Sequence, residues 1–268
     1  MQNPNNQNAR VFSILLMAEL AEGKGRFVND LMNGVLFFSE MTSWAESAHL
    51  AVFQKTRRAM PDFREDVLEL HQGGMAQMLS WTYYFLKDSF DKIDPMIALR
   101  LRHELQKREL DPFMQRDDFW WMGRNYKEGA LLNNWTPWCN ANALLCFMLL
   151  EDNPDTLAKA VYKSMESVDK FLNYVKSDGA CEEGPSYWGH ASGKLYDYLS
   201  ELSLITGGKI NLFGNEQIRK MGEYIARSYI GDEWVANFAD ASARAGEVNT
   251  SIIYRYGVAV NSKMMKSM

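Results

Sequence analysis

Residues 133–175 read NNWTPWCNANALLCFMLLEDNPDTLAKAVYKSMESVDKFLNYV, and this stretch indicates the fold class. Thr136-Pro137 and Asn153-Pro154 each place a capping side chain before a proline, which is the favoured chemistry at the start of a helix. The pattern predicts one helix from Trp138 to Leu150 and a second from Asp155 to Val175. Because the loop between them is short, the two helices are expected to pack antiparallel.

The rest of the chain shows the same helical periodicity. Apolar residues at helical spacing predict further helices over 11–21, 26–38, 63–87, 93–110, 189–205 and 216–229. We expect Gly23, Asp111-Pro112 and Gly207-Gly208 to end three of these helices, and Ser39–Leu50 to form a loop or a short turn. Residues 234–260 alternate β-branched and aromatic side chains, which suits one or two short strands.

No linker or low-complexity segment divides the 268 residues, so the sequence predicts a single all-α domain built as a ring of antiparallel helix pairs. The net charge of −5 argues against a surface that attracts polyanions, so no nucleic-acid partner is expected. No run of 18 apolar residues occurs, and no membrane partner is expected. The polar start, MQNPNNQNAR, does not read as a signal peptide.

The cysteine and histidine patterns predict no metal and no cofactor within this chain. Cys139 and Cys146 lie two turns apart on one predicted helix, about 10 Å, which is too far for a disulfide. Neither an H-x-x-x-H nor a C-x-x-C spacing is present. His49, His71 and His103 stand alone in the sequence, so each is expected to be a structural histidine.

Two segments carry more polar and aromatic residues than a core requires. Asn133–Asn140 sets amides and tryptophans at a helix start, where free N–H groups favour anions. Asp178–His190 sets a Tyr-Trp pair in a turn rich in glycine, which would offer flat surfaces to sugar rings. The alternatives are ordinary capping with core tryptophans for the first segment, and a helix–helix turn with a hydrophobic staple for the second.

Together the two segments resemble the heparinase II/III-like polysaccharide lyase family, whose members carry Asn-Asn-Trp and Cys-Asn at a helix start, followed by Asp-Gly, Glu-Gly-Pro and Tyr-Trp-Gly. Asn237-Phe238-Ala239-Asp240 is a third similar motif, and the likeness extends from about Trp44 to Asp240. The resemblance implies an incomplete (α/α) toroid followed by a β-sandwich domain that this chain lacks, so the chain is expected to be a fragment. It further implies a periplasmic or secreted enzyme that cleaves an acidic, uronate-containing polysaccharide by β-elimination.

By the same resemblance, the catalytic residues are Asn134, Tyr187 and His190. Asn134, with Asn133, would neutralise the uronate carboxylate through N–H donors that add no charge. Tyr187 would take the C5 proton and return a proton to O4, helped by a cation from His190, Lys194 or Arg244. The remaining residues predicted to bind substrate are Trp135, Trp138, Glu183, Trp188, Asp240 and Arg244.

The sequence departs from the family at two of these positions. Several lyases have a histidine where this chain has Trp135, and other members have a tyrosine where it has His190.

Two alternative functions therefore stand beside the lyase. One is a glycoside hydrolase on a similar helical barrel, with Glu183 and Asp240 as carboxylates roughly 5–10 Å apart. The other is a domain that binds glycans without catalysis.

Overall fold

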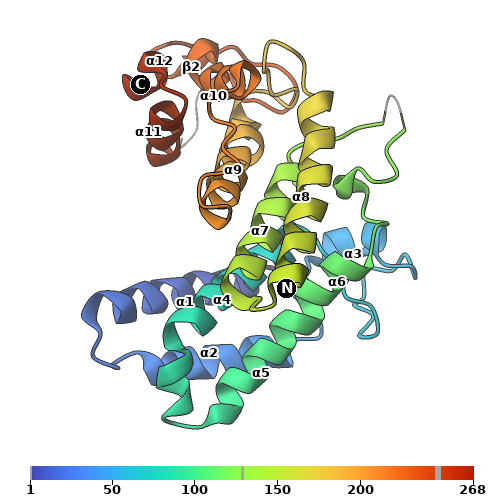
Figure 1. The fold of residues 1–268 in the computed structure, drawn as a ribbon, viewed down its shortest axis with the longest axis vertical. Helices are drawn as coiled ribbons and strands as arrows, with labels where there is room; N and C mark the ends of the chain where they lie inside the picture. Colours follow the sequence, from blue (N-terminus) through green and yellow to red (C-terminus); the bar gives the residue numbers. More distant parts are fainter. Residues whose placement is uncertain (1, 128–129, 245–248) are drawn as a thin grey trace. The chain divides into compact units, whose positions relative to one another are not determined.

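The computed structural model describes residues 2–127, 130–244 and 249–268, and over these residues the fold is all-α, as the sequence predicts (Figure 1). A two-stranded antiparallel sheet, in which Tyr229 pairs with Val235, accompanies the helices. The helices and strands are α1 (Gln2–Glu22), α2 (Val28–Glu40), α3 (Ser47–Phe53), α4 (Leu70–Asp91), α5 (Pro95–Leu105), η1 (Gln106–Leu110), α6 (Asp111–Gln115), η2 (Trp120–Met122), α7 (Trp135–Leu150), α8 (Pro154–Tyr174), η3 (Pro185–Tyr187), η4 (Gly189–Gly193), α9 (Lys194–Ile205), α10 (Glu216–Ser228), β1 (Tyr229–Gly231), β2 (Trp234–Val235), α11 (Thr250–Ala259) and α12 (Lys263–Lys266).

The chain forms two compact units. Unit 1 comprises residues 1–119 and 145–160, and unit 2 comprises residues 120–144 and 161–268. The sequence also predicts a toroid and a single domain over residues 1–268. Both describe how the whole chain is arranged, and both stay predictions. In the part of the chain that the structure describes, every helix is too short or too polar to cross a lipid bilayer.

Unit 1 is built around the hairpin of α4 and α5, which pack against each other and against α2 (Figure 1). Leu79 and Leu101 lie fully buried in this packing. The helix predicted from Phe63 begins later, at Leu70, because the Glu69 carboxylate accepts a hydrogen bond from the Gln72 N–H and so caps α4. The expected loop over Ser39–Leu50 also needs correction, since its end contains the start of α3.

The predicted helix break at Asp111-Pro112 is wrong. The chain passes from α5 through the π-helical turn η1 directly into α6, with Pro112 in the first turn of α6. A proline at this position has no N–H to donate to the carbonyl oxygen of Arg108, four residues earlier. That oxygen instead accepts a hydrogen bond from Gln72 Nε2 at 2.8 Å. A side chain from α4 therefore supplies the bond that the proline removes.

Unit 2 has a core of aromatic and aliphatic side chains from α7 to α12. Trp188 and Tyr256 lie fully buried within it, with ring centroids 6.2 Å apart. Each of the two polar tips is satisfied by a backbone carbonyl of α10, Met221 O for the indole and Ile218 O for the phenol. Buried Trp and Tyr side chains usually need such bonds. The Trp188 bond fixes the turn at residues 185–193 against α10, and the Tyr256 bond fixes α11 against it.

The chain after residue 234 is less extended than the sequence predicts. Val235 and Trp234 do belong to a strand, but residues 250–259 form the helix α11. The Asn249 side chain accepts a hydrogen bond from the Ile252 N–H, and Ile253 and Tyr256 bury one face of the helix. A local cap and a tertiary contact therefore outweigh the strand preference of the β-branched residues.

Several predicted helix ends are confirmed by their capping bonds. The Asn153 side chain accepts hydrogen bonds from the N–H groups of Asp155 and Thr156, both at 3.0 Å. The helix α8 begins at Pro154, directly after this cap. Gly207 and Gly208 adopt positive φ angles of 58° and 79°, which end α9 as expected.

Unit 1 buries the carboxyl group of Glu109 beside a neutral amide. Glu109 lies on η1 and is 2 % exposed, with Gln72 Nε2 donating to it at 2.8 Å. Burial raises the pKa of Glu109 to about 7, and the hydrogen bond from Gln72 opposes this rise without cancelling it. The folded chain therefore holds a proton that the unfolded chain has already lost at about pH 6.

We expect this proton to make the stability of the chain depend on pH. Because the folded-state pKa lies above the ordinary value of 4.5, the contribution is complete below pH 4.5 and is lost as the pH rises through about 7. The loss amounts to up to about 3 kcal/mol of unfolding free energy. Glu109→Gln, measured by urea unfolding across this pH range, should flatten that part of the profile. The exposed Glu22 on α1 gives the control, Glu22→Gln; parallel profiles for the parent chain and Glu109→Gln would contradict the prediction.

Candidate functional site

The first predicted segment lies at the start of α7, but its capping differs from the expectation. The helix begins at Trp135, so Thr136 lies inside its first turn and is not the cap. The Asn133 side-chain oxygen, two residues before the helix, accepts from the Trp135 N–H at 3.2 Å. The Thr136 hydroxyl donates instead to the carbonyl of Trp121 at 2.8 Å. This hydrogen bond from Thr136 joins α7 to the preceding segment at Trp121.

Asn134 joins the first segment to the second. Its side chain is 4 % exposed, and Nδ2 donates to Glu183 Oε2 at 2.6 Å. Burial raises the pKa of Glu183, the hydrogen bonds from Asn134 oppose the rise, and the charges of Glu182 and Asp240 add to it. The amide predicted to hold a substrate carboxylate therefore already holds a carboxyl group of the protein, and that group binds a proton more readily than an exposed glutamate does.

The third motif meets the second at Gly184, whose backbone has φ +89°. A β-carbon at this position would lie 2.6 Å from the Phe238 carbonyl oxygen and 2.7 Å from the Ala241 β-carbon. Only glycine allows so close an approach with this φ angle. Asp240 therefore lies in the segment that packs on the Glu183-Gly184 turn, in agreement with its effect on the pKa of Glu183.

A stack of rings lies one helical turn beyond Asn134. Trp138 and His190 are parallel, with centroids 4.8 Å apart, and Tyr187 meets the His190 ring edge-on at 5.7 Å. Lys194 Nζ lies 5.6 Å from the centre of the Trp138 ring and also pairs with Asp197. Desolvation and the charge of Lys194 lower the pKa of His190, which favours the neutral imidazole. This lowering disfavours the histidine cation that the sequence predicted beside Tyr187.

A small cavity of about 40 Å³ is lined in part by Asn133 and Asn134. Glu182 and Glu183 line it together with Tyr174, whose hydroxyl donates to Glu182. Burial, together with that carboxylate, raises the pKa of Tyr174 to about 12, which makes this phenol a poor base. The volume suits a water molecule and is too small for a sugar ring. Tyr187 is not among the lining residues, so Asn134 and Tyr187 do not share this cavity, contrary to the expectation of one common pocket.

Three other predicted contacts lie elsewhere in unit 2. Trp188 is 1 % exposed in the core, which corrects its predicted role in substrate binding. Trp135 is half-buried and packs at 5.4 Å on Trp120, which is partly exposed. Arg244 lies 4.9 Å from the ring centre of Trp234, with which it forms an isolated β-bridge. The three motifs that resemble the family therefore meet around Asn134, Glu183 and Gly184. The stacked rings of Trp138 and His190 follow one helical turn after Asn134.

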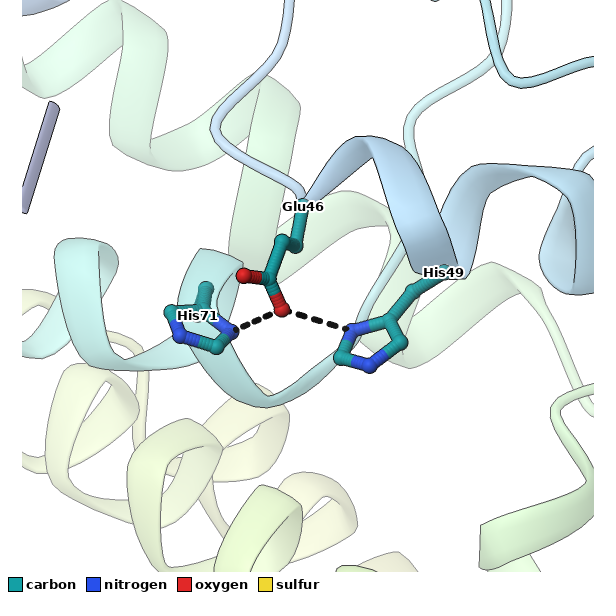
Figure 2. A group of neighbouring side chains, drawn as sticks. All are labelled: Glu46, His49 and His71. Atoms are coloured by element: carbon teal, nitrogen blue, oxygen red, sulfur yellow. Dashed lines mark ion pairs between the residues drawn. The ribbon is translucent and has the colours of Figure 1, made fainter. Parts of the chain in front are cut away.

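A second group of polar side chains lies in unit 1, and the sequence analysis did not predict it. Glu46, His49, Glu69 and His71 form this group, which we call the histidine–glutamate cluster. Figure 2 shows the Glu46 carboxylate between the two imidazole rings, at 3.2 Å from His71 Nδ1 and 3.7 Å from His49 Nδ1. The sequence signal is the pair of spacings Glu46-x-x-His49 and Glu69-x-His71. Each histidine looked isolated because 21 residues stand between them, and only the approach of α3 to the start of α4 brings them together.

No protein-family model and no curated protein matches this chain. The resemblance to the heparinase II/III-like family therefore stays a hypothesis that depends on its three motifs.

The contact at Gly184 can be tested with a matched pair of substitutions in one turn. Gly184→Ala adds a β-carbon where the backbone is left-handed and the Phe238–Ala241 segment is closest, so we expect the unfolding free energy to fall by at least about 2 kcal/mol. Gly189→Ala, where a β-carbon would meet nothing within 4 Å, should have little effect. Thermal and urea unfolding give the comparison, and equal stabilities for the two variants would show that the packing at Gly184 is looser than described.

Proposed function

We propose that unit 2 binds a uronate-containing polysaccharide and cleaves it by β-elimination, as a heparinase II/III-like lyase. The observation that supports this best is the convergence of the three motifs, through the Asn134–Glu183 hydrogen bond and the packing of Gly184 on Phe238 and Ala241. The first and third motifs stand about 100 residues apart in the chain, and both contact the Glu183-Gly184 turn of the second motif, which favours a common site. A periplasmic or secreted location and the toroid belong to the same proposal.

The role of Asn134 in this mechanism is to neutralise the uronate carboxylate. An amide nitrogen carries two N–H donors, and one of them donates to Glu183. A substrate carboxylate would lie close to Glu183, and two carboxylates at such a distance repel each other. Because burial raises the pKa of Glu183, this group can take up a proton when the substrate binds, and two carboxyl groups that share a proton are tolerated.

Tyr187 then carries the proton transfers. The C5–H proton passes to the tyrosine oxygen, the electron pair of the C5–H bond forms the C4=C5 double bond, and O4 leaves with the electron pair of the C4–O4 bond and a proton. This step requires the phenolate form of Tyr187. His190 packs edge-on against the Tyr187 ring, with the ring centroids 5.7 Å apart, and would orient the tyrosine for the transfers.

The proposal is tested by incubating the chain with alginate, heparan sulfate, chondroitin sulfate and hyaluronan and following the ultraviolet absorbance of the unsaturated product. Tyr187→Phe should lower the rate about 10²–10⁴-fold, because the proton-transfer group is lost. Tyr162→Phe, an exposed tyrosine on α8 of the same unit, is the control and should retain full activity. A Tyr187→Phe variant as active as the parent chain would exclude the mechanism. Binding of a polymer without any cleavage would favour a glycan-binding domain.

A glycoside hydrolase is the second candidate, because the charge of Asp240 contributes to the raised pKa of Glu183. A carboxylic acid that keeps its proton beside an ionised carboxylate is the arrangement that glycoside hydrolysis needs. Product analysis separates the two enzymes, since hydrolysis yields a reducing end without a double bond. In the hydrolase Glu183→Gln would abolish cleavage, whereas in the lyase Glu183→Gln, which keeps an uncharged side chain beside Asn134, should remain active.

A further inference from the structure

The cluster of Glu46, His49, Glu69 and His71 lies in unit 1, outside the proposed polysaccharide site. Glu46 immediately precedes α3, His49 follows in its first turn, and His71 stands in the first turn of α4 (Figure 2). One coordinating atom from each of Glu46, His49 and His71 lies within 4.8 Å of the others. Two imidazoles and one carboxylate form a ligand set that zinc uses in open, water-bearing sites.

The distance between Glu46 and His71 matches such a site. Glu46 Oε2 lies 3.2 Å from His71 Nδ1 and 3.7 Å from His49 Nδ1. Ligands bonded to a tetrahedral zinc ion at about 2.0–2.1 Å are separated from one another by roughly 3.3 Å. Glu46 and His71 are therefore already spaced for an ion. His49 Nδ1 is bonded to Glu69 Oε2 at 2.6 Å, so His49 would bind the ion through its other ring nitrogen, Nε2.

Glu69 holds the ligands in place from behind. Its side chain is fully buried, and Oε2 lies 2.6 Å from His49 Nδ1. Oε1 accepts from the backbone N–H of Glu46 at 3.1 Å and from that of Gln72 at 2.8 Å. A carboxylate bonded to one nitrogen of a ligating histidine fixes the orientation of the ring and increases its basicity. The same group thus orients a histidine ligand and anchors the backbone of a glutamate ligand.

Glu46 itself is not used for helix capping. It stands at the N-cap position of α3, yet its side chain makes no capping hydrogen bond and is directed at the histidines (Figure 2). The cluster is open to solvent on one side, since the side chain of His71 is 44 % exposed, compared with 24 % for His49 and 17 % for Glu46. An ion can therefore enter, and a water molecule can complete its coordination.

We propose that Glu46, His49 and His71 bind one divalent transition-metal ion of the zinc class, with Glu69 as the group that positions the ligands. Imidazole nitrogen favours Zn²⁺ and Co²⁺ over Ca²⁺ and Mg²⁺, which require sets of oxygen ligands. The bound ion joins the start of α3 to the start of α4 and thereby ties down the loop of residues 54–69 between them.

The test uses the chain after chelator treatment and removal of any affinity tag, titrated separately with Zn²⁺, Co²⁺ and Ca²⁺. Calorimetry should give one Zn²⁺ per chain and no Ca²⁺, and Zn²⁺ should raise the melting temperature. Co²⁺ should produce visible absorption without a sulfur charge-transfer band. That band would indicate binding at Cys139, Cys146 or Cys181, and it would overturn the assignment, as would the absence of Zn²⁺ binding.

Variants connect the binding to the named residues. His71→Ala and Glu46→Gln should each weaken Zn²⁺ binding at least about 100-fold, and Glu69→Gln about 10–100-fold. His103→Ala removes an exposed histidine of α5 and is the matched control, with unchanged affinity. Because the side chain of His71 is 44 % exposed and lies outside the core of unit 1, its variant should keep that core, which circular dichroism of the metal-free protein would verify. If His71→Ala binds Zn²⁺ as tightly as His103→Ala does, the cluster is only an ion-pair network that caps α4.

Discussion

The hydrogen bond from Asn134 to Glu183 holds together the two motif-bearing parts of unit 2. It joins the start of α7 to the turn before α9 at a distance of 2.6 Å. A hydrogen bond of this kind contributes about 0.5–1.5 kcal/mol to stability, and removing one partner from a buried pair costs more. With the helix start and the turn fixed at this point, Trp138 lies against His190, and Gly184 lies against the segment that carries Asp240.

The same bond also limits the chemistry available to the site. Asn134 already holds Glu183, so under the proposed function a uronate carboxylate would meet Asn134 beside Glu183, and its binding would favour the protonated form of Glu183. The small cavity at this point gives room for water alone, and Tyr187 does not line it. The shared pocket for Asn134 and Tyr187 that the sequence suggested is therefore not this cavity.

Unit 1 illustrates how one buried side chain can serve several elements. The Gln72 backbone N–H donates to the Glu69 carboxylate that caps α4. The Gln72 side chain donates to Glu109 and to the Arg108 carbonyl oxygen, to which Pro112 has no N–H to donate. The histidine–glutamate cluster begins one residue away, at His71. The start of α4 is thus a junction at which capping, a π-helical turn and a group of metal-binding side chains depend on one another.

The sequence by itself determined the all-α class and those helix ends that local chemistry controls. Asn153 caps α8, and Gly207 and Gly208 end α9. Tertiary structure decided the rest. The helix continues through Pro112 because a side chain of α4 replaces the missing bond, and Trp188 belongs to the core because Met221 accepts its N–H. His49 and His71 come together because α3 approaches α4. Each of these outcomes depends on a partner distant in the chain, and neither periodicity nor capping residues carry information about such partners.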